Sequence, residues 1–203
     1  MTTRRPAGDA AKRLFDVVVA ATGLVATLPV TLTAAGAILL TMGRPVLFRQ
    51  QRPGRGGRPF EILKFRTMRG AVDADGRPLP DAERLTSLGR FLRATSIDEL
   101  PELLNVLTGD MSLVGPRPDV PGFADQLTGE DRIILNVKPG ITGPATLQYR
   151  REEELLRGQP DPERFNREVV FPTKVRINRE YVENYSLRKD LVYLKATLLS
   201  WMS

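Results

Sequence analysis

The longest apolar stretch of the chain lies near its N-terminus. Residues 17–43 carry no formal charge over 27 positions, which exceeds the roughly 20 residues that a bilayer-spanning helix needs. Pro29 lies near the middle, where a proline removes one internal hydrogen bond and kinks a helix. Nearby threonines can hydrogen-bond to carbonyls that the kink frees: Thr22, Thr27, Thr31 and Thr33. This pattern predicts a kinked membrane helix.

Two membrane topologies compete for this helix: it either spans the bilayer or enters it, breaks at Pro29 and returns to the same side. Cytoplasmic ends of membrane helices carry an excess of Lys and Arg, and here both flanks are basic: Arg4, Arg5, Lys12 and Arg13 before the helix, and Arg44, Arg49, Arg52, Arg55 and Arg58 after it. This symmetry favours the re-entrant helix. A buried helix of a soluble protein fits the length less well.

Two short apolar runs follow, separated by a segment rich in Gly and Pro. Residues 46–49 and 60–66 predict strands, and residues 52–58 predict the loop of a β-hairpin. Period-two alternation places Lys64 and Arg66 on one face of the second strand. Solvated cations on an edge strand are the ordinary interpretation of such a pattern.

Helical spacing of apolar residues marks two later segments. Residues 100–107 predict a helix that ends at Gly109. Residues 182–201 predict an amphipathic helix with leucines on one face, which either closes the core or lies in the membrane interface. The N-terminal membrane segment and the terminal Trp favour the interface. Residues 81–88 predict a short helix that begins with a capping aspartate, and residues 162–175 predict a polar, irregular segment.

These elements predict a mostly helical α+β fold in two parts. Residues 1–43 form the re-entrant membrane helix, and residues 44–203 form one compact cytoplasmic domain with a small hairpin and the C-terminal amphipathic helix. A length of 203 residues suffices for one domain with a core. The net charge of +6 indicates a polyanionic partner: nucleic acid, anionic lipid or a phosphorylated small molecule.

The chain contains neither cysteine nor histidine. This excludes disulfides, thiolate nucleophiles, Cys-based metal sites and catalytic triads built on histidine. Catalysis therefore depends on carboxylates, Lys, Tyr, Ser or Thr, and a metal bound through oxygen ligands is a hard ion such as magnesium.

An acidic pair, Asp98 and Glu99, is the main candidate for chemistry. Ser96 followed three residues later by Glu99 fits a helix capping box, but Pro101, which prefers the first helical position, would then fall at the fifth. We therefore expect a turn that enters a helix near Pro101 and keeps Asp98 ionised beside the helix N-terminus, as a nucleophile or metal ligand. Adjacent carboxylates do not face each other, which argues against the opposed acid pair of a glycosidase.

Arg117 lies between two prolines, which fix the backbone on both sides of it. A solvated loop and a phosphate-binding arginine fit this turn equally well. A carboxylate nucleophile, cations and a membrane segment together favour phosphoryl transfer on a lipid.

The sequence also resembles a known family, the small monotopic phosphoglycosyl transferases, also called bacterial sugar transferases. The resemblance lies in the apolar segment with Pro29 and in a series of motifs in the family's order, at residues 12–16, 48–54, 64–68, 96–101, 105–112, 114–118 and 138–143. It implies transfer of a sugar-1-phosphate from a UDP-sugar to polyprenyl phosphate, with release of UMP, at the cytoplasmic face of the bacterial inner membrane. This is the first membrane step of a surface glycoconjugate pathway such as exopolysaccharide synthesis.

The resemblance also implies residue roles. Asp98 is the nucleophile that forms a phosphosugar-enzyme intermediate, Glu99 assists, and both lie beside a magnesium ion. Lys64, Arg93 and Arg117 match positions near the substrate phosphates, and the family supports re-entry at Pro29.

The sequence leaves two other functions open. One is a membrane-tethered basic adaptor that binds anionic lipid or nucleic acid, although an aromatic content of 6% provides little surface for base stacking, so nucleic acid is not expected. The other is hydrolysis of a nucleotide sugar. Residues 144–154 depart from the common family pattern and receive no role, and neither the sugar nor the oligomeric state follows from the sequence.

Overall fold

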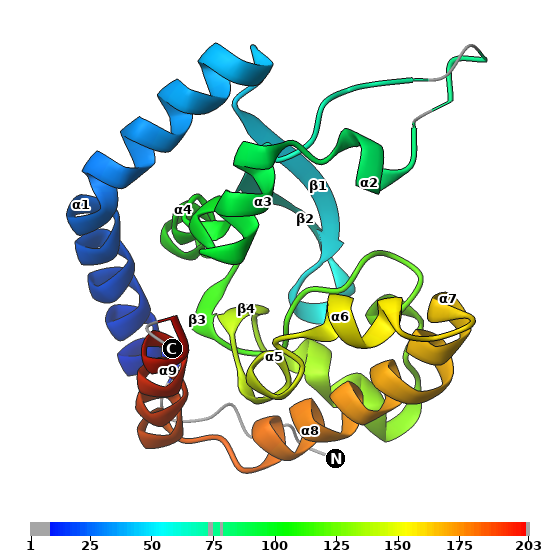
Figure 1. The fold of residues 1–203 in the computed structure, drawn as a ribbon. Helices are drawn as coiled ribbons and strands as arrows, with labels where there is room; N and C mark the ends of the chain where they lie inside the picture. Colours follow the sequence, from blue (N-terminus) through cyan, green and yellow to red (C-terminus); the bar gives the residue numbers. More distant parts are fainter. Residues whose placement is uncertain (1–8, 73–74, 78, 202–203) are drawn as a thin grey trace.

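The computed structural model describes residues 9–72, 75–77 and 79–201, so the predicted basic residues Arg4 and Arg5 lie outside the described part. The helices are α1 (Asp9–Met42), α2 (Asp81–Arg84), α3 (Ser87–Ala94), α4 (Glu102–Thr108), α5 (Pro144–Gln148), α6 (Glu152–Arg157), α7 (Pro162–Phe165), α8 (Phe171–Glu183) and α9 (Leu187–Trp201). The strands are β1 (Leu47–Pro53), β2 (Pro59–Phe65), β3 (Ser112–Val114) and β4 (Gly140–Thr142). This confirms a mostly helical α+β fold with small sheets (Figure 1).

The predicted apolar helix is confirmed as α1, which is long and apolar enough to cross a membrane. It remains helical through Pro29, and Figure 1 shows that it bends in its middle. The hydroxyl of Thr33 donates to the carbonyl of Pro29 at 2.8 Å, and that of Thr27 donates to the carbonyl of Gly23 at 2.7 Å. These are ordinary bonds from a threonine to the carbonyl four residues earlier. Neither is made to the carbonyl of Val25, which Pro29 leaves without its helical donor, so the predicted compensation of the kink by threonines is not seen among the described residues.

Both ends of α1 contact the rest of the chain. Near its start, the Nζ atom of Lys12 lies 2.8 Å from Oδ2 of Asp190 in α9. Just beyond its end, Arg66 donates to the carbonyl of Gly43 at 2.6 Å. At 1.5 Å per residue the helix is about 51 Å long, and Figure 1 shows other elements lying along most of it.

The predicted hairpin is confirmed by antiparallel pairing of β1 with β2, from Leu47 opposite Phe65 to Pro53 opposite Pro59. A second, parallel pair joins β3 to β4. The sequence predicts only loops there, because each strand has three residues and its partner lies far along the chain. A Cβ atom on Gly140 would lie 2.1 Å from the backbone nitrogen of Gly115, so the close approach of β4 to the segment after β3 requires glycine at residue 140.

Among the described residues, three apolar clusters form the core. One joins α1, β2, α4, β3 and α8, and contains Ala20, Ile62, Val106, Met111, Leu113, Val114 and Tyr181. The second joins the end of α1 to β2 and α3, and contains Ala34, Ile38, Phe65 and Leu92. The third lies under α8 and contains Ala124, Ile134, Leu135 and Val175. The first two clusters fix α1 against the elements that carry the acidic pair.

Three helix predictions need correction. The helix predicted at residues 81–88 is divided into α2 and α3, because Thr86 caps α3 by accepting a hydrogen bond from the amide of Gly89 at 2.9 Å. The segment predicted as irregular, residues 162–175, is helical, since Val170 and Val175 are buried. The C-terminal helix is confirmed as α9, but it begins only at Leu187.

Candidate active site

The acidic pair lies in a tight turn between α3 and α4. Ser96 has left-handed backbone geometry (φ 54°) and no capping hydrogen bond from its side chain, so the capping-box interpretation is wrong. A single 3-10 turn, Ile97–Glu99, follows, and Pro101 directly precedes α4. The predicted turn that enters a helix near Pro101 is confirmed.

Glu99 is bound by two cations from distant parts of the chain. The Nζ atom of Lys64, in β2, lies 2.7 Å from Oε1 of Glu99. Arg117, from the turn between two prolines, donates to the same carboxylate. Burial alone would raise the pKa of Glu99, but Arg117 and Lys64 together lower it well below its usual range. Glu99 is therefore ionised at neutral pH.

Asp98 has a different environment from its neighbour. Its side chain is buried, and no hydrogen bond or ion pair joins its carboxylate to another residue within the part of the chain that the structure describes. Burial, and then the charge of Glu99, raise the pKa of Asp98 to about 6, against the opposite effect of the nearby cations. The raised pKa shows that burial and Glu99 outweigh the helix N-terminus, which the sequence predicted would keep Asp98 ionised.

Arg93 approaches the pair from α3. Its Nε atom donates to Oγ1 of Thr67 at 3.1 Å, and its Nη1 atom lies 3.6 Å from Oε1 of Glu153 in α6. A Cβ atom on Gly89 would lie 2.0 Å from the carbonyl oxygen of Thr67, so glycine permits α3 to approach this segment closely. Glu153 belongs to the segment that departs from the common family pattern.

Glu102 is a third carboxylate, which the sequence prediction missed. Its side chain is 1% exposed, and its Oε1 atom lies 3.2 Å from Nζ of Lys64. Burial and the charge of Glu99 raise its pKa to about 7. Glu102 follows Glu99 by about one helical turn, so this spacing in the sequence could have identified it as a carboxylate close to the pair.

The structure thus brings together the predicted residues Lys64, Arg93 and Arg117, all of which act electrostatically on Asp98. Pro29 lies apart from them within α1. The described residues contain no group of three or more acidic side chains arranged to bind a metal. Magnesium typically uses one or two carboxylates together with substrate phosphates and water. The Asp98 carboxylate, which has no partner among the described residues, fits that mode; Glu99 is already bound to Lys64 and Arg117.

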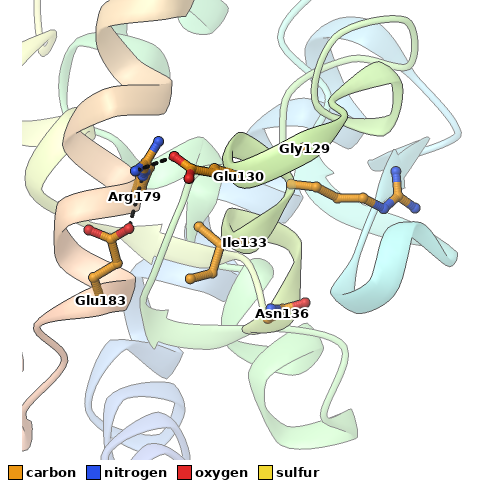
Figure 2. A pocket seen from close by; sticks show the side chains of 7 residues that line it. Gly129, Glu130, Ile133, Asn136, Arg179 and Glu183 are labelled. Atoms are coloured by element: carbon orange, nitrogen blue, oxygen red, sulfur yellow. Dashed lines mark hydrogen bonds and ion pairs between the residues drawn. The ribbon is translucent and has the colours of Figure 1, made fainter. Parts of the chain in front are cut away.

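A hollow of about 430 Å³ lies away from this site, between α8 and the segment Gly129–Asn136 (Figure 2). Arg179 is the cation of α8 that lines it, and its charge is neutralised by Glu130 at 2.7 Å and Glu183 at 2.9 Å. None of the predicted site residues lines this hollow.

Comparison with known proteins agrees with the resemblance. The bacterial sugar transferase family profile matches residues 7–203. The chain is 41% identical over 187 residues to the uncharacterized sugar transferase EpsL of Bacillus subtilis, covering 92% of this chain and 85% of that protein. It is 39% identical over 217 residues to the UDP-glucose:undecaprenyl-phosphate glucose-1-phosphate transferase of Caulobacter vibrioides, covering 100% of this chain and 76% of that protein.

A third relative is the exopolysaccharide production protein ExoY of Sinorhizobium fredii, which is 33% identical over 211 residues, covering 96% of this chain and 86% of that protein. The profile match and the relatives span nearly the whole chain, including the acidic pair and its cations. The chain belongs to the bacterial sugar transferase family.

Proposed function

We propose that this protein transfers a sugar-1-phosphate from a UDP-sugar to a polyprenyl phosphate and releases UMP, as the first membrane step of exopolysaccharide synthesis. The relatives' names support the substrates and the pathway. The observation that carries the chemistry is the carboxylate of Asp98, which lies near three cations and is unpaired within the part of the chain that the structure describes. A carboxylate nucleophile divides one difficult transfer into two easier steps at one site.

In the first step an oxygen of Asp98 attacks the phosphorus that bears the sugar. The bond from that phosphorus to the UMP oxygen breaks, and UMP leaves with the electron pair. In the second step an oxygen of the polyprenyl phosphate attacks the aspartyl phosphorus and releases the Asp98 carboxylate. The product is a polyprenyl diphosphate sugar, and the enzyme returns to its starting state.

The cations have distinct tasks in this scheme. Lys64 and Arg117 lie beside Glu99 and offset the charge of an incoming diphosphate, which would otherwise repel Asp98. Arg93 lies on α3 and orients a phosphate oxygen from a second direction. Magnesium, held by Asp98 and Glu99 with substrate phosphates and water, would neutralise further phosphate charge when bound. Because Glu99 already binds two cations, Asp98 is the carboxylate more open to the metal.

We further propose that α1 enters the cytoplasmic face of the membrane and returns to it. Its start is bound to Asp190 and its end to Arg66, and both residues belong to one domain. A spanning helix would place these two ends on opposite faces of a hydrocarbon layer about 30 Å thick. Both α1 and α9 expose large apolar side chains, which suits contact with lipid: Leu14, Val18, Val25, Leu40, Leu191, Val192, Leu198 and Leu199. The exposed cations of α9, Arg188, Lys189 and Lys195, suit the headgroup layer.

The test is UMP release by the purified protein in nanodiscs, with a panel of UDP-sugars that includes UDP-glucose, with and without polyprenyl phosphate. Asp98→Asn should abolish release, whereas Asp81→Asn, an exposed matched control, should leave it unchanged. Intact-mass analysis of protein mixed with UDP-sugar alone should show one added sugar phosphate. Turnover retained by Asp98→Asn would remove Asp98 as the nucleophile. Multiple turnovers without lipid would instead indicate hydrolysis.

A further inference from the structure

One lysine of α8 is buried between two acidic side chains. Lys174 has a side chain that is 8% exposed, and its Nζ atom lies 3.1 Å from Oδ1 of Asp119 and 3.3 Å from Oε2 of Glu152. Lysine is seldom buried, and a buried ammonium is tolerated only when it is paired. The three residues come from separate segments of the chain, so this contact joins parts that no local sequence pattern connects.

Asp119 directly follows the turn that carries Arg117. Prolines 116 and 118 fix the backbone on both sides of that arginine, so a shift of Asp119 is transmitted to Arg117. The carbonyl of Pro118 also accepts a hydrogen bond from Nη1 of Arg52 at 3.3 Å. Lys174 and Arg52 thus both attach this turn to the rest of the protein.

Glu152 is the first residue of α6, and the next residue, Glu153, lies 3.6 Å from Arg93. The two acids have different environments, because the side chain of Glu153 is 77% exposed and that of Glu152 is 27% exposed. Glu152 therefore attaches α6 to Lys174 in the interior, while Glu153 faces a site arginine.

We propose that Lys174 is a positioning residue for the transfer reaction. By joining the Arg117 turn to α6, it sets where Arg117 and, through Glu153, Arg93 lie relative to Asp98. The effect on catalysis rests on the proposed function, whereas the effect on the two segments does not. Residues 144–154, which depart from the common family pattern, thereby acquire a role: they connect the two arginines through a buried lysine.

The first experiment is hydrogen exchange of the full chain in nanodiscs, read by mass spectrometry at residues 115–119 and 150–157. In Lys174→Met, amides in both segments should exchange about tenfold faster or more, whereas α4 and α9 should keep their wild-type rates. Lys174→Arg should restore most of the protection. Arg179→Met is the matched control, because it removes a partly exposed, acid-paired cation from the same helix that contacts neither segment, and it should change neither segment.

The second experiment measures kcat and KM for the UDP-sugar in the same variants. Lys174→Met should raise KM about tenfold, because both arginines are displaced before substrate binds, and Lys174→Arg should recover most of the loss. If the wild-type protein releases no UMP, the proposed function fails, while the exchange experiment still decides the positioning role.

A third variant separates positioning from stability. Lys174→Met alone leaves the half-buried carboxylates of Asp119 and Glu152 without their counter-ion, which destabilises a fold. The triple variant Asp119→Asn, Glu152→Gln, Lys174→Met removes all three charges, so its Tm should return toward the wild-type value while exchange at the two segments stays fast. The proposal is overturned if the triple variant also recovers protection, or if Lys174→Met leaves both segments unchanged or loosens the whole chain equally.

Discussion

Arg117 binds the carboxylate of Glu99, the residue next to the proposed nucleophile Asp98. Lys64 donates to the same carboxylate, so one member of the acidic pair is doubly paired and the other is unpaired among the described residues. The pKa of Glu99 is consequently lowered, while that of Asp98 is raised to about 6. Neighbouring carboxylates with diverging pKa values typically have different roles. We infer that Glu99 fixes two cations beside the site and leaves Asp98 available to the phosphorus.

The planar geometry of Arg117 should matter as well as its charge. Arg117→Lys keeps the charge but replaces a fork of donors with a single ammonium group. We expect kcat/KM for the UDP-sugar to fall roughly tenfold to a hundredfold, or about 1.4 to 2.7 kcal/mol of transition-state stabilisation. Arg164→Lys, which alters an exposed pair with Glu168, is the control. Equal kinetics for the two variants would show that charge alone suffices at residue 117.

The activity should depend on pH through Asp98, which attacks only as a carboxylate. Its pKa of about 6 predicts that kcat/KM at low magnesium rises from pH 5 to pH 7 with a midpoint near 6. Raising the magnesium concentration should move this midpoint to lower pH, because a nearby cation favours the ionised form. A profile that is flat between pH 5 and pH 8 would contradict the assignment.

Unfolding does not account for that predicted loss of activity at pH 5. A carboxyl whose pKa is raised, such as Asp98, stabilises the fold at pH values below 3.8, its usual pKa. This contribution is lost as the pH rises through about 6. Glu99 behaves in the opposite way. Its lowered pKa stabilises the fold at pH values above 4.5, the usual pKa of Glu, and this contribution is lost only as the pH falls below that value. Thermal unfolding at pH 5 is the control measurement.

Glu102→Gln should stabilise the protein in a pH-dependent way. Burial and Glu99 raise the pKa of Glu102 from its usual 4.5 to about 7, so its contribution to folding is present below pH 4.5 and lost as the pH rises through 7. Glutamine has the same shape without the charge. The Tm difference between variant and wild type should therefore grow from pH 5 to pH 8, at about 2 to 4 °C per kcal/mol. A difference that is constant with pH would exclude titration of Glu102 in this range.

Local patterns in the sequence predicted the elements that depend on neighbouring residues. The hairpin follows from a Gly/Pro-rich turn between apolar runs, and α4 ends as predicted at Gly109, which has a φ of 95°. The turn at the acidic pair follows from the helix preference of Pro101. The two membrane topologies could be ranked only by the charge of the flanks.

Contacts between distant residues could not be predicted in the same way. Lys64 and Arg66 were predicted on one face of a strand, yet Lys64 binds Glu99 whereas Arg66 binds the carbonyl of Gly43 at the end of α1. The polar composition of residues 162–175 predicted an irregular segment, but burial of Val170 and Val175 stabilises helices there. Tertiary packing overrides local preference in such segments, and the pairs of Lys174 depend entirely on it.

The topology of α1 can be tested because the chain contains no cysteine. Single cysteines at Ala11→Cys and Arg44→Cys, both at exposed positions, mark the two flanks of the helix. A membrane-impermeant maleimide should label both in inverted vesicles and neither in right-side-out vesicles, because both flanks contact the same domain. Labelling from opposite sides would establish a spanning helix. The domain would then have to detach from one end of α1, and loss of the contact between Lys12 and Asp190 or between Arg66 and Gly43 would show which end.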